Sequence, residues 1–301
     1  MSALAPLPTT VIPTTVIPTT VRIRRSARRS LIVTGEWIMR PCSQVLIGTA
    51  AVLALIGQPS AADHSRQDHA TSNRAPQTCS AQSTATVAPL IELYTSEGCS
   101  SCPPADRWLS RRRDDPALVA LAFHVDYWDK LGWKDRFASP AYSLRQARQQ
   151  PINGARFSYT PQVVLNGRDQ PRWHAAPLPT AENARTAATV TLTLSYGVDE
   201  VMATILPDAG APARLAAYWA VTEDGHFTAV RAGENRGEGL RHDAVVREYV
   251  QVPEWAAHNG TARTLRFTPT QAESADHPRH INLVVIDAVT GKPLQALRLD
   301  C

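Results

Sequence analysis

The most informative part of the sequence is Pro89-Leu-Ile-Glu-Leu-Tyr-Thr-Ser-Glu-Gly-Cys99-Ser-Ser-Cys102-Pro-Pro. It joins an apolar, strand-like segment to two cysteines and then to two prolines that can start a helix. A thiol at the start of a helix has its thiolate stabilised by the helix dipole, and a second thiol three residues later can close a disulfide. The order therefore predicts a redox site, with Cys99 as the nucleophile and Cys102 as the resolving thiol. The alternative is a static disulfide that only fixes the turn.

A second landmark lies further along the chain, in Ser158-Tyr-Thr160-Pro161-Gln-Val-Val-Leu-Asn-Gly167. It resembles the loop of thioredoxin-fold proteins in which a cis proline faces the cysteine pair. The resemblance implies a cis bond between Thr160 and Pro161, which costs little before proline. It also implies that the backbone of Thr160 pairs with an extended substrate strand beside Cys99. A trans proline at the start of a strand is the alternative.

Three further segments extend the resemblance to a whole family. They are Phe123-His-Val-Asp-Tyr-Trp-Asp-Lys-Leu-Gly-Trp-Lys-Asp-Arg-Phe-Ala-Ser-Pro140, Gly233-Glu-Asn-Arg-Gly237 and Leu240-Arg-His-Asp-Ala-Val-Val-Arg247. With the two landmarks they are similar to the bacterial secreted proteins catalogued as domain of unknown function 1223, a thioredoxin-like family. The resemblance covers most of the chain beyond residue 88 and implies a fold. The family has no assigned activity, so the chemistry has to be argued from the residues.

The balance of charges does not indicate a basic surface for nucleic acid. The 301 residues carry a net charge of +4, but residues 1–62 hold six arginines and one glutamate. Without them, 25 cations face 26 anions and the net charge is −1. We therefore expect no nucleic-acid partner.

The N-terminal segments predict export. Residues 1–38 contain a short repeat and are interpreted as a non-native extension, and residues 39–62 have the charged start, apolar centre and small-residue end of a signal peptide. The apolar centre is too short to span a bilayer, so we expect no stable membrane span and cleavage near Ala62. The mature protein would then be periplasmic or secreted, beginning with a disordered leader over residues 63–86.

The remaining sequence suggests two domains. Residues 87–188 are predicted to form an α/β thioredoxin-like domain with a helical and aromatic insertion over 127–159. Alternating apolar segments with Gly-, Asp- and Pro-rich turns follow, and they predict an all-β antiparallel sandwich-like domain over 189–301.

Three other positions are candidates for chemistry or cross-linking. Glu92 precedes Cys99 by seven residues, and if it is buried beneath Cys102 it can accept that thiol's proton. An edge-facing glutamate is the alternative. Cys79 and Cys301 remain after the local pair is assigned, and an even number of cysteines in an oxidising compartment favours a structural disulfide between them. Two unpaired thiols near mobile ends are the alternative.

Three functions follow as hypotheses. The first is an exported thiol-disulfide oxidoreductase that acts on thiols or disulfides, with proteins as the expected substrates. Its own disulfide is the redox group, and no other cofactor is expected. The second is a copper-binding metallochaperone using Cys99, Cys102 and His124, because soft thiolates and imidazole suit copper. The third is a non-catalytic binding protein whose disulfide is structural.

Overall fold

Strands dominate the computed structural model, which describes residues 79–175 and 186–301. In the first half the strands are β1 (Cys79–Gln82), β2 (Leu90–Thr95), β3 (Val119–His124), β4 (Gln162–Leu165) and β5 (Arg168–Asp169). In the second half they are β6 (Val190–Tyr196), β7 (Val201–Pro207), β8 (Arg214–Glu223), β9 (His226–Ala229), β10 (Gly239–His242), β11 (Val245–Ala256), β12 (Arg263–Phe267), β13 (Arg279–Asp287) and β14 (Pro293–Asp300). The helices are α1 (Pro103–Ser110), the 3-10 turn η1 (Asp129–Leu131) and α2 (Pro140–Asn153).

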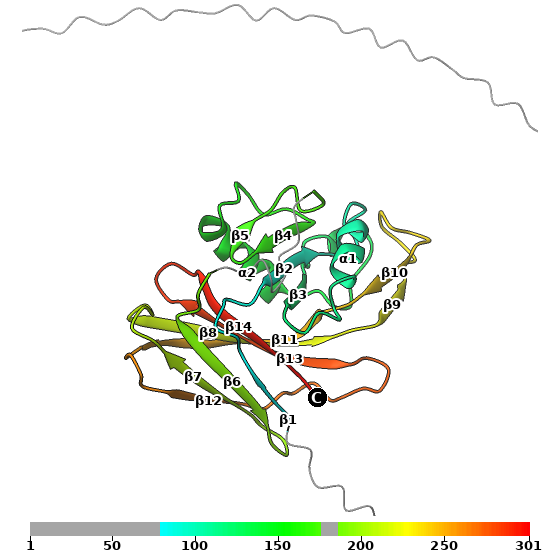
Figure 1. Cartoon of the computed structure of the whole chain (residues 1–301). Coiled ribbons are helices and arrows are strands. Elements are labelled where there is room, and N and C mark those ends of the chain that lie inside the picture. Colours follow the sequence, from blue (N-terminus) through cyan, green and yellow to red (C-terminus); the bar gives the residue numbers. More distant parts are fainter. Residues whose placement is uncertain (1–78, 176–185) are drawn as a thin grey trace, which may run out of the picture. The chain divides into compact units, whose positions relative to one another are not determined.

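An eight-stranded mixed sheet runs through both halves of the chain, in the order β14-β13-β8-β11-β3-β2-β4-β5. Strand β2 is parallel to β3 and antiparallel to β4. The join between the halves is made by β11, because Val245 pairs in parallel with Ala122 of β3 and the Ala122 N–H donates to the carbonyl of Ala244 at 2.7 Å. Figure 1 shows β11 passing beside β3.

This sheet overturns the predicted architecture of an α/β thioredoxin-like domain over 87–188 followed by an all-β sandwich-like domain over 189–301. Far more of the described residues lie in strands than in helices, and the two predicted domains share the eight-stranded sheet. The prediction was wrong because it assigned the strands of the two halves to separate sheets, whereas β3 of the first half is paired with β11 of the second. The local sequence around β3 contains no signal for a partner strand more than 100 residues away.

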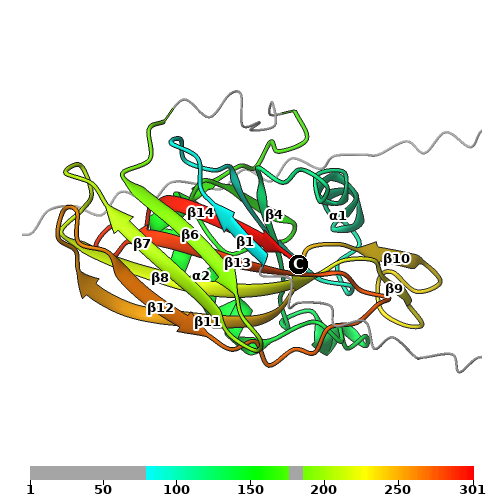
Figure 2. The ribbon, with the colours of Figure 1, turned by 60° about the horizontal axis from the view of Figure 1, so that its bottom comes forward.

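A four-stranded sheet, in the order β1-β6-β7-β12, packs against the large one. Alternate side chains of β6 and β7, such as Leu192 and Ile205, meet Trp219 of β8 and Leu283 of β13 in one buried cluster. Figure 2 shows β6, β7 and β12 lying across β8 and β13. Residues 79–82, the first described part of the predicted leader over 63–86, form β1 and pair with β6. The predicted extension 1–38 and signal peptide 39–62 lie outside the described residues.

The helices lie on opposite faces of the large sheet. Ile91 and Leu93 of β2 share a buried cluster with Trp108 of α1, whereas Leu90 of β2 shares one with Tyr142 of α2. This division follows from the alternation of side chains along a strand. In residues 79–175 and 186–301, no helix is long and apolar enough to cross a membrane.

Candidate functional site

Cys99 and Cys102 form a disulfide at the junction between β2 and α1. The chain turns tightly there, because the N–H of Cys99 donates to the carbonyl of Ser96 and the N–H of Cys102 to that of Cys99. Cys102 is the N-cap residue of α1, and the two prolines after it start the helix without leaving an N–H unpaired. Both cysteines are 0% exposed. A local strand-turn-helix sequence is therefore enough to place the two sulfur atoms together.

The Thr160–Pro161 loop lies directly against this disulfide. The peptide bond between the two residues is cis, and the Thr160 hydroxyl lies 3.3 Å from Cys99 Sγ. The Trp128 Nε1–H donates to the same hydroxyl at 2.8 Å, which leaves the Thr160 hydrogen free to point at the sulfur. A side chain at Gly98 would approach Trp128 Cβ to 3.0 Å, so glycine permits the close contact of Trp128 with the turn.

A loop from the second half of the chain covers the cysteines. This covering loop, residues 230–238, joins β9 to β10. Its Asn235 side chain is buried and donates to the carbonyls of Glu97 (2.9 Å) and Cys99 (3.0 Å). The Glu234 carboxylate accepts hydrogen bonds from the Ser100 N–H (3.1 Å) and hydroxyl (2.8 Å). Those hydrogen bonds lower the pKa of Glu234. The loop is thus fastened on both sides of Cys99.

Buried ionisable groups lie near the cysteine turn. His242 of β10 is 2% exposed, and its two ring nitrogens lie 3.6 Å from Glu97 Oε1 and 3.8 Å from Asp106 Oδ1. Asp106 stands one helical turn after Cys102, and its Oδ2 accepts a hydrogen bond from the Thr95 hydroxyl at 3.1 Å. The imidazole is therefore held between two carboxylates, one before Cys99 and one after Cys102.

The electrostatics of this cluster favour an imidazolium. Burial alone would lower the pKa of His242, but the carboxylates of Asp106 and Glu97 raise the pKa to about 10. Burial opposes ionisation of Glu97 as well, yet His242 and the Trp133 N–H hold the pKa of Glu97 below its usual value. The cluster thus places a positive charge between two negative ones at the base of the cysteine turn.

A second buried pair adjoins the first. His124 Nδ1 lies 2.7 Å from Asp135 Oδ2, which also accepts the N–H of Glu97 at 2.9 Å. Burial would raise the pKa of Asp135, but His124 and backbone N–H donors lower it to about 2. The rings of His124 and His242 are 5.0 Å apart. The end of β3, where His124 lies, is thereby tied to the turn that carries the cysteines.

Glu92, the predicted proton acceptor for Cys102, lies elsewhere. It is on the face of β2 that packs against α2, where it forms an ion pair with Arg145 and accepts a hydrogen bond from the Tyr218 hydroxyl at 2.7 Å. The structure brings Cys99, Cys102, Thr160 and Pro161 together, but it does not bring Glu92 to the sulfur atoms.

The copper set of Cys99, Cys102 and His124 is not assembled in this oxidised form. The sulfur atoms are bonded to one another, and one ring nitrogen of His124 is occupied by Asp135. Among residues 79–175 and 186–301, no group of three or more His, Cys, Asp or Glu side chains is arranged to hold a metal ion. Copper binding by the reduced protein stays a prediction.

Cys79 and Cys301 form the second disulfide, which links β1 to the end of β14. Each of its ends is at least partly exposed.

Sequence reasoning missed Glu97, Asp106, Asp135 and His242. Each had a signal nearby: Glu97 and Asp106 flank the cysteine run, while Asp135 and His242 lie in the quoted segments 123–140 and 240–247. The spatial meeting of these segments could not be seen, because β10 is brought to α1 only by the hairpin that β9 and β10 form.

Two solved structures are similar to this chain. One is the crystal structure of a protein from Agrobacterium tumefaciens, with 24% identity, a TM-score of 0.52, and coverage of 72% of this chain and 96% of that one. The other is HBP35 of Porphyromonas gingivalis, with 15% identity, a TM-score of 0.50, and coverage of 72% and 76%. At these identities the likeness concerns the fold alone. No curated protein matches the chain in sequence.

The family comparison covers the site and most of the sheet around it. Residues 90–286 match the family described as "Protein of unknown function (DUF1223)". The matched range holds both cysteines of the buried disulfide, the Thr160–Pro161 loop, the covering loop and His242. The chain therefore belongs to the DUF1223 family.

Proposed function

We propose that this protein is a thiol-disulfide oxidoreductase whose working group is the Cys99–Cys102 disulfide. The observation that carries the proposal is the contact between Cys99 Sγ and the Thr160 hydroxyl at 3.3 Å. It places a polar hydrogen-bond donor beside the sulfur that a substrate thiolate would attack. A disulfide used only as a cross-link does not need such a donor at one of its sulfur atoms.

The proposed reaction is a two-step exchange. A substrate thiolate attacks Cys99 Sγ, the Cys99–Cys102 bond breaks, and Cys102 leaves as a thiolate that takes up a proton. A second substrate thiol, deprotonated, then attacks the substrate sulfur of the mixed disulfide and releases Cys99. The substrate dithiol is oxidised to a disulfide, and the protein disulfide is reduced to two thiols. The same steps in reverse reduce a substrate disulfide.

The surroundings support distinct roles for the neighbouring residues. Thr160 positions Cys99 and can donate to its sulfur when that atom carries negative charge. The His242 imidazolium, near the start of α1, offsets part of the negative charge that Glu97 and Asp106 bring to the cysteine turn, so that these carboxylates oppose a thiolate there less strongly. Glu97 and Asp106 act as positioning residues for His242.

Access to the sulfur atoms requires movement of the covering loop. Both cysteines are fully buried beneath Asn235 and its neighbours, so a substrate cannot reach Cys99 while residues 230–238 stay closed. Gly233 and Gly237 have φ values of 73° and 91°, a backbone region that favours glycine. The proposal therefore includes opening of this loop as the step before exchange.

The proposed location is outside the cytoplasm. The signal-peptide pattern of residues 39–62 supports it, as do the two disulfides, which persist in oxidising compartments. The proposed substrate is a protein thiol or disulfide.

Equilibration of the folded protein with mixtures of reduced and oxidised glutathione tests the proposal. We expect two thiols to appear reversibly at Cys99 and Cys102, and the protein to catalyse reduction of insulin disulfides. Cys99→Ser should remove this turnover, while Cys102→Ser should trap a substrate in a mixed disulfide with Cys99. A disulfide that stays oxidised until the protein unfolds would refute the proposal and favour the structural alternative.

A further inference from the structure

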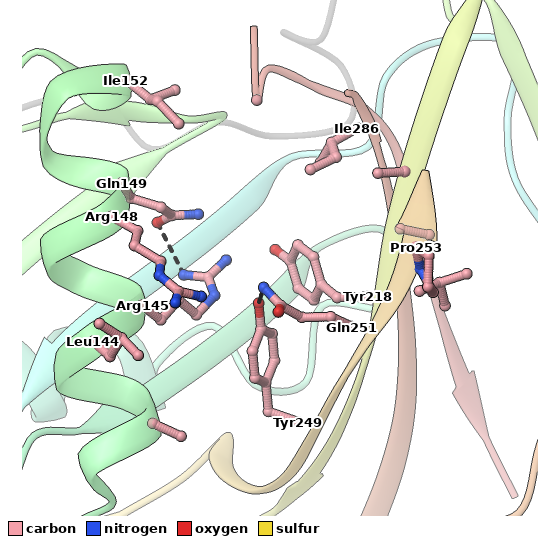
Figure 3. Close-up of a pocket in the computed structure, with 15 residues that line it drawn as sticks. Leu144, Arg145, Arg148, Gln149, Ile152, Tyr218, Tyr249, Gln251, Pro253 and Ile286 are labelled. Atoms are coloured by element: carbon pink, nitrogen blue, oxygen red, sulfur yellow. Dashed lines mark hydrogen bonds between the residues drawn. The ribbon is translucent and has the colours of Figure 1, made fainter. Parts of the chain in front are cut away.

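A cavity lies on the face of the large sheet that α1 does not cover. It has a volume of about 760 Å³ and is formed between α2 and strands β8 and β11, with Ile286 and Gly291 closing one side. Figure 3 shows Arg145, Arg148 and Gln149 extending from α2 across from Tyr218, Tyr249 and Gln251. Cavities of this size with mixed apolar and polar walls are typical of small-molecule sites.

The charges around the cavity all have one sign. Two arginines and no aspartate or glutamate line it. The charge of Arg145 is already compensated, because this buried side chain forms an ion pair with Glu92. Arg148 forms no ion pair with any residue in the described part of the chain, so one guanidinium charge remains uncompensated at the cavity.

The unused hydrogen-bonding groups are mostly donors. The guanidinium of Arg145 is not available to a ligand, because its terminal nitrogens are bonded within the protein and its Nε is shielded from solvent. The Tyr249 hydroxyl accepts a hydrogen bond from Gln251 at 3.0 Å and keeps its own hydrogen. The Tyr249 hydroxyl and the five N–H groups of Arg148 are donors that suit an anionic oxygen ligand.

The remaining wall is apolar and reaches the surface. Leu144 and Ile152 of α2 are each 50% exposed at the cavity, and Ile286 and Val252 lie among its lining residues. Large aliphatic side chains left half exposed beside a cavity provide a surface on which an apolar chain can pack.

We propose that this cavity binds a monocarboxylate with an aliphatic body, an amphiphile of the size of a medium-chain fatty acid. The carboxylate pairs with Arg148 and accepts a hydrogen bond from the Tyr249 hydroxyl, and the chain packs on Leu144 and Ile152. A single negative charge matches the one uncompensated guanidinium, whereas a phosphate monoester would bring a surplus charge. The site lies on the opposite face of the sheet from the disulfide and is independent of the exchange chemistry.

Calorimetric titration of the full folded protein with sodium decanoate tests the proposal, with hexanoate and tetradecanoate bracketing the chain length. We expect saturable binding of one equivalent. Decanol, which lacks the charge, and acetate, which lacks the chain, should each bind at least tenfold more weakly. With ¹³C-carboxyl decanoate, the carboxyl resonance should shift on binding and titrate with the same affinity.

Variants separate the site from adventitious binding. Arg148→Gln should weaken decanoate binding at least tenfold, and Leu144→Asp should do the same by placing a carboxylate at the cavity; both positions are exposed enough to tolerate the change. Arg156→Gln is the matched control, because Arg156 is an exposed arginine that does not line the cavity. The proposal is overturned if no carboxylate of the series binds, if decanol binds as tightly as decanoate, or if Arg148→Gln and Arg156→Gln behave alike.

Discussion

Cys79 and Cys301 are 222 positions apart and join two strand ends at the surface, whereas Cys99 and Cys102 are three positions apart and lie buried under a loop. In the chain-entropy account a cross-link stabilises a protein by constraining the unfolded chain, and its effect grows with the length of the loop. That account gives about 5 kcal/mol for the long-range bond and about 2 kcal/mol for the local one. The two bonds therefore differ in what each can contribute to stability.

The surroundings differ in the opposite sense. The long-range bond has the exposed ends of β1 and β14 beside it, while the local bond has a threonine hydroxyl, a covering loop and a buried imidazolium between two carboxylates. Burying so many polar groups is unfavourable unless they are paired with one another. The buried polar groups, whose desolvation opposes folding, thus surround the disulfide that contributes less to stability.

The largest difference should appear in turnover. The double variant Cys99→Ala, Cys102→Ala should lose all insulin reduction while its free energy of unfolding falls by only about 2 kcal/mol. Urea denaturation and the insulin assay on the same preparation measure both quantities. Residual turnover above that of buffer would place the chemistry on other residues.

The converse variant should lose stability and keep its activity. We expect Cys79→Ser with Cys301→Ser to lower the free energy of unfolding by about 5 kcal/mol, because the denatured chain gains the freedom of a 222-residue loop. Turnover per folded molecule should not change. Under excess reductant, the wild-type protein and this variant should have the same midpoint of unfolding, because both disulfides are then absent from both proteins. A fall in turnover of the variant would contradict the prediction and show that the long-range bond also supports activity.

Loss of the buried imidazolium should have the next largest effect. His242→Gln leaves Glu97 and Asp106 facing each other without a cation, which we expect to cost about 3 kcal/mol at pH 6. The pKa of His242 is about 10 in the folded protein and about 6.5 when unfolded, so its stabilisation is complete below pH 6.5 and is lost as the pH rises to 10.

The difference in unfolding free energy between wild type and His242→Gln should therefore be largest at pH 6 and shrink toward pH 10. His280, whose pKa is raised to about 9 by Asp224 and Asp300 against the effect of burial, titrates in both proteins and cancels in the difference. His258→Gln, at an exposed position, should follow the wild type throughout. A difference that does not depend on pH would mean that His242 is neutral in the fold.

The smallest effect concerns access to the local bond. Glu234→Ala removes two hydrogen bonds to Ser100, so the covering loop should open more often and dithiothreitol should reduce the bond about tenfold faster. Glu238→Ala is the control, because it changes an exposed glutamate in the same loop. Equal rates in wild type and Glu234→Ala would show that the loop does not limit access.

Features that depend on contacts between residues close in sequence could be predicted, and features that depend on distant residues could not. The apolar run before Cys99 predicts a strand, and the structure confirms it as β2 at Leu90–Thr95. This strand could be predicted because a run of consecutive apolar residues by itself indicates a buried strand. The contact of the Thr160–Pro161 loop with Cys99 was accessible through a motif resemblance. The separation into two domains failed, since the pairing of Val245 with Ala122 leaves no local trace in either segment.

The same limit explains the error at Glu92. Its distance from Cys99 along the chain suggested a role beneath Cys102, but the side chain points to the other face of β2. Its ion-pair partner, Arg145, lies 53 positions away on α2. The sequence of β2 alone does not indicate this partner, so the position of the Glu92 side chain could not be predicted from it. The carboxylates near the cysteine turn are instead Glu97 and Asp106, which lie on either side of the disulfide in sequence.

The long-range bond has a consequence for biogenesis. During synthesis or passage through a membrane the chain appears from its N-terminal side, so Cys79 meets Cys99 and Cys102 some 200 residues before Cys301 becomes available. The strand that holds Cys79 in place, β6, also emerges after all three thiols. Either Cys79 must stay reduced until β14 has formed, or an early bond from Cys79 to Cys99 or Cys102 must be reshuffled. In the oxidising compartment proposed above, maturation should therefore depend on a disulfide isomerase more strongly than the two bonds alone suggest.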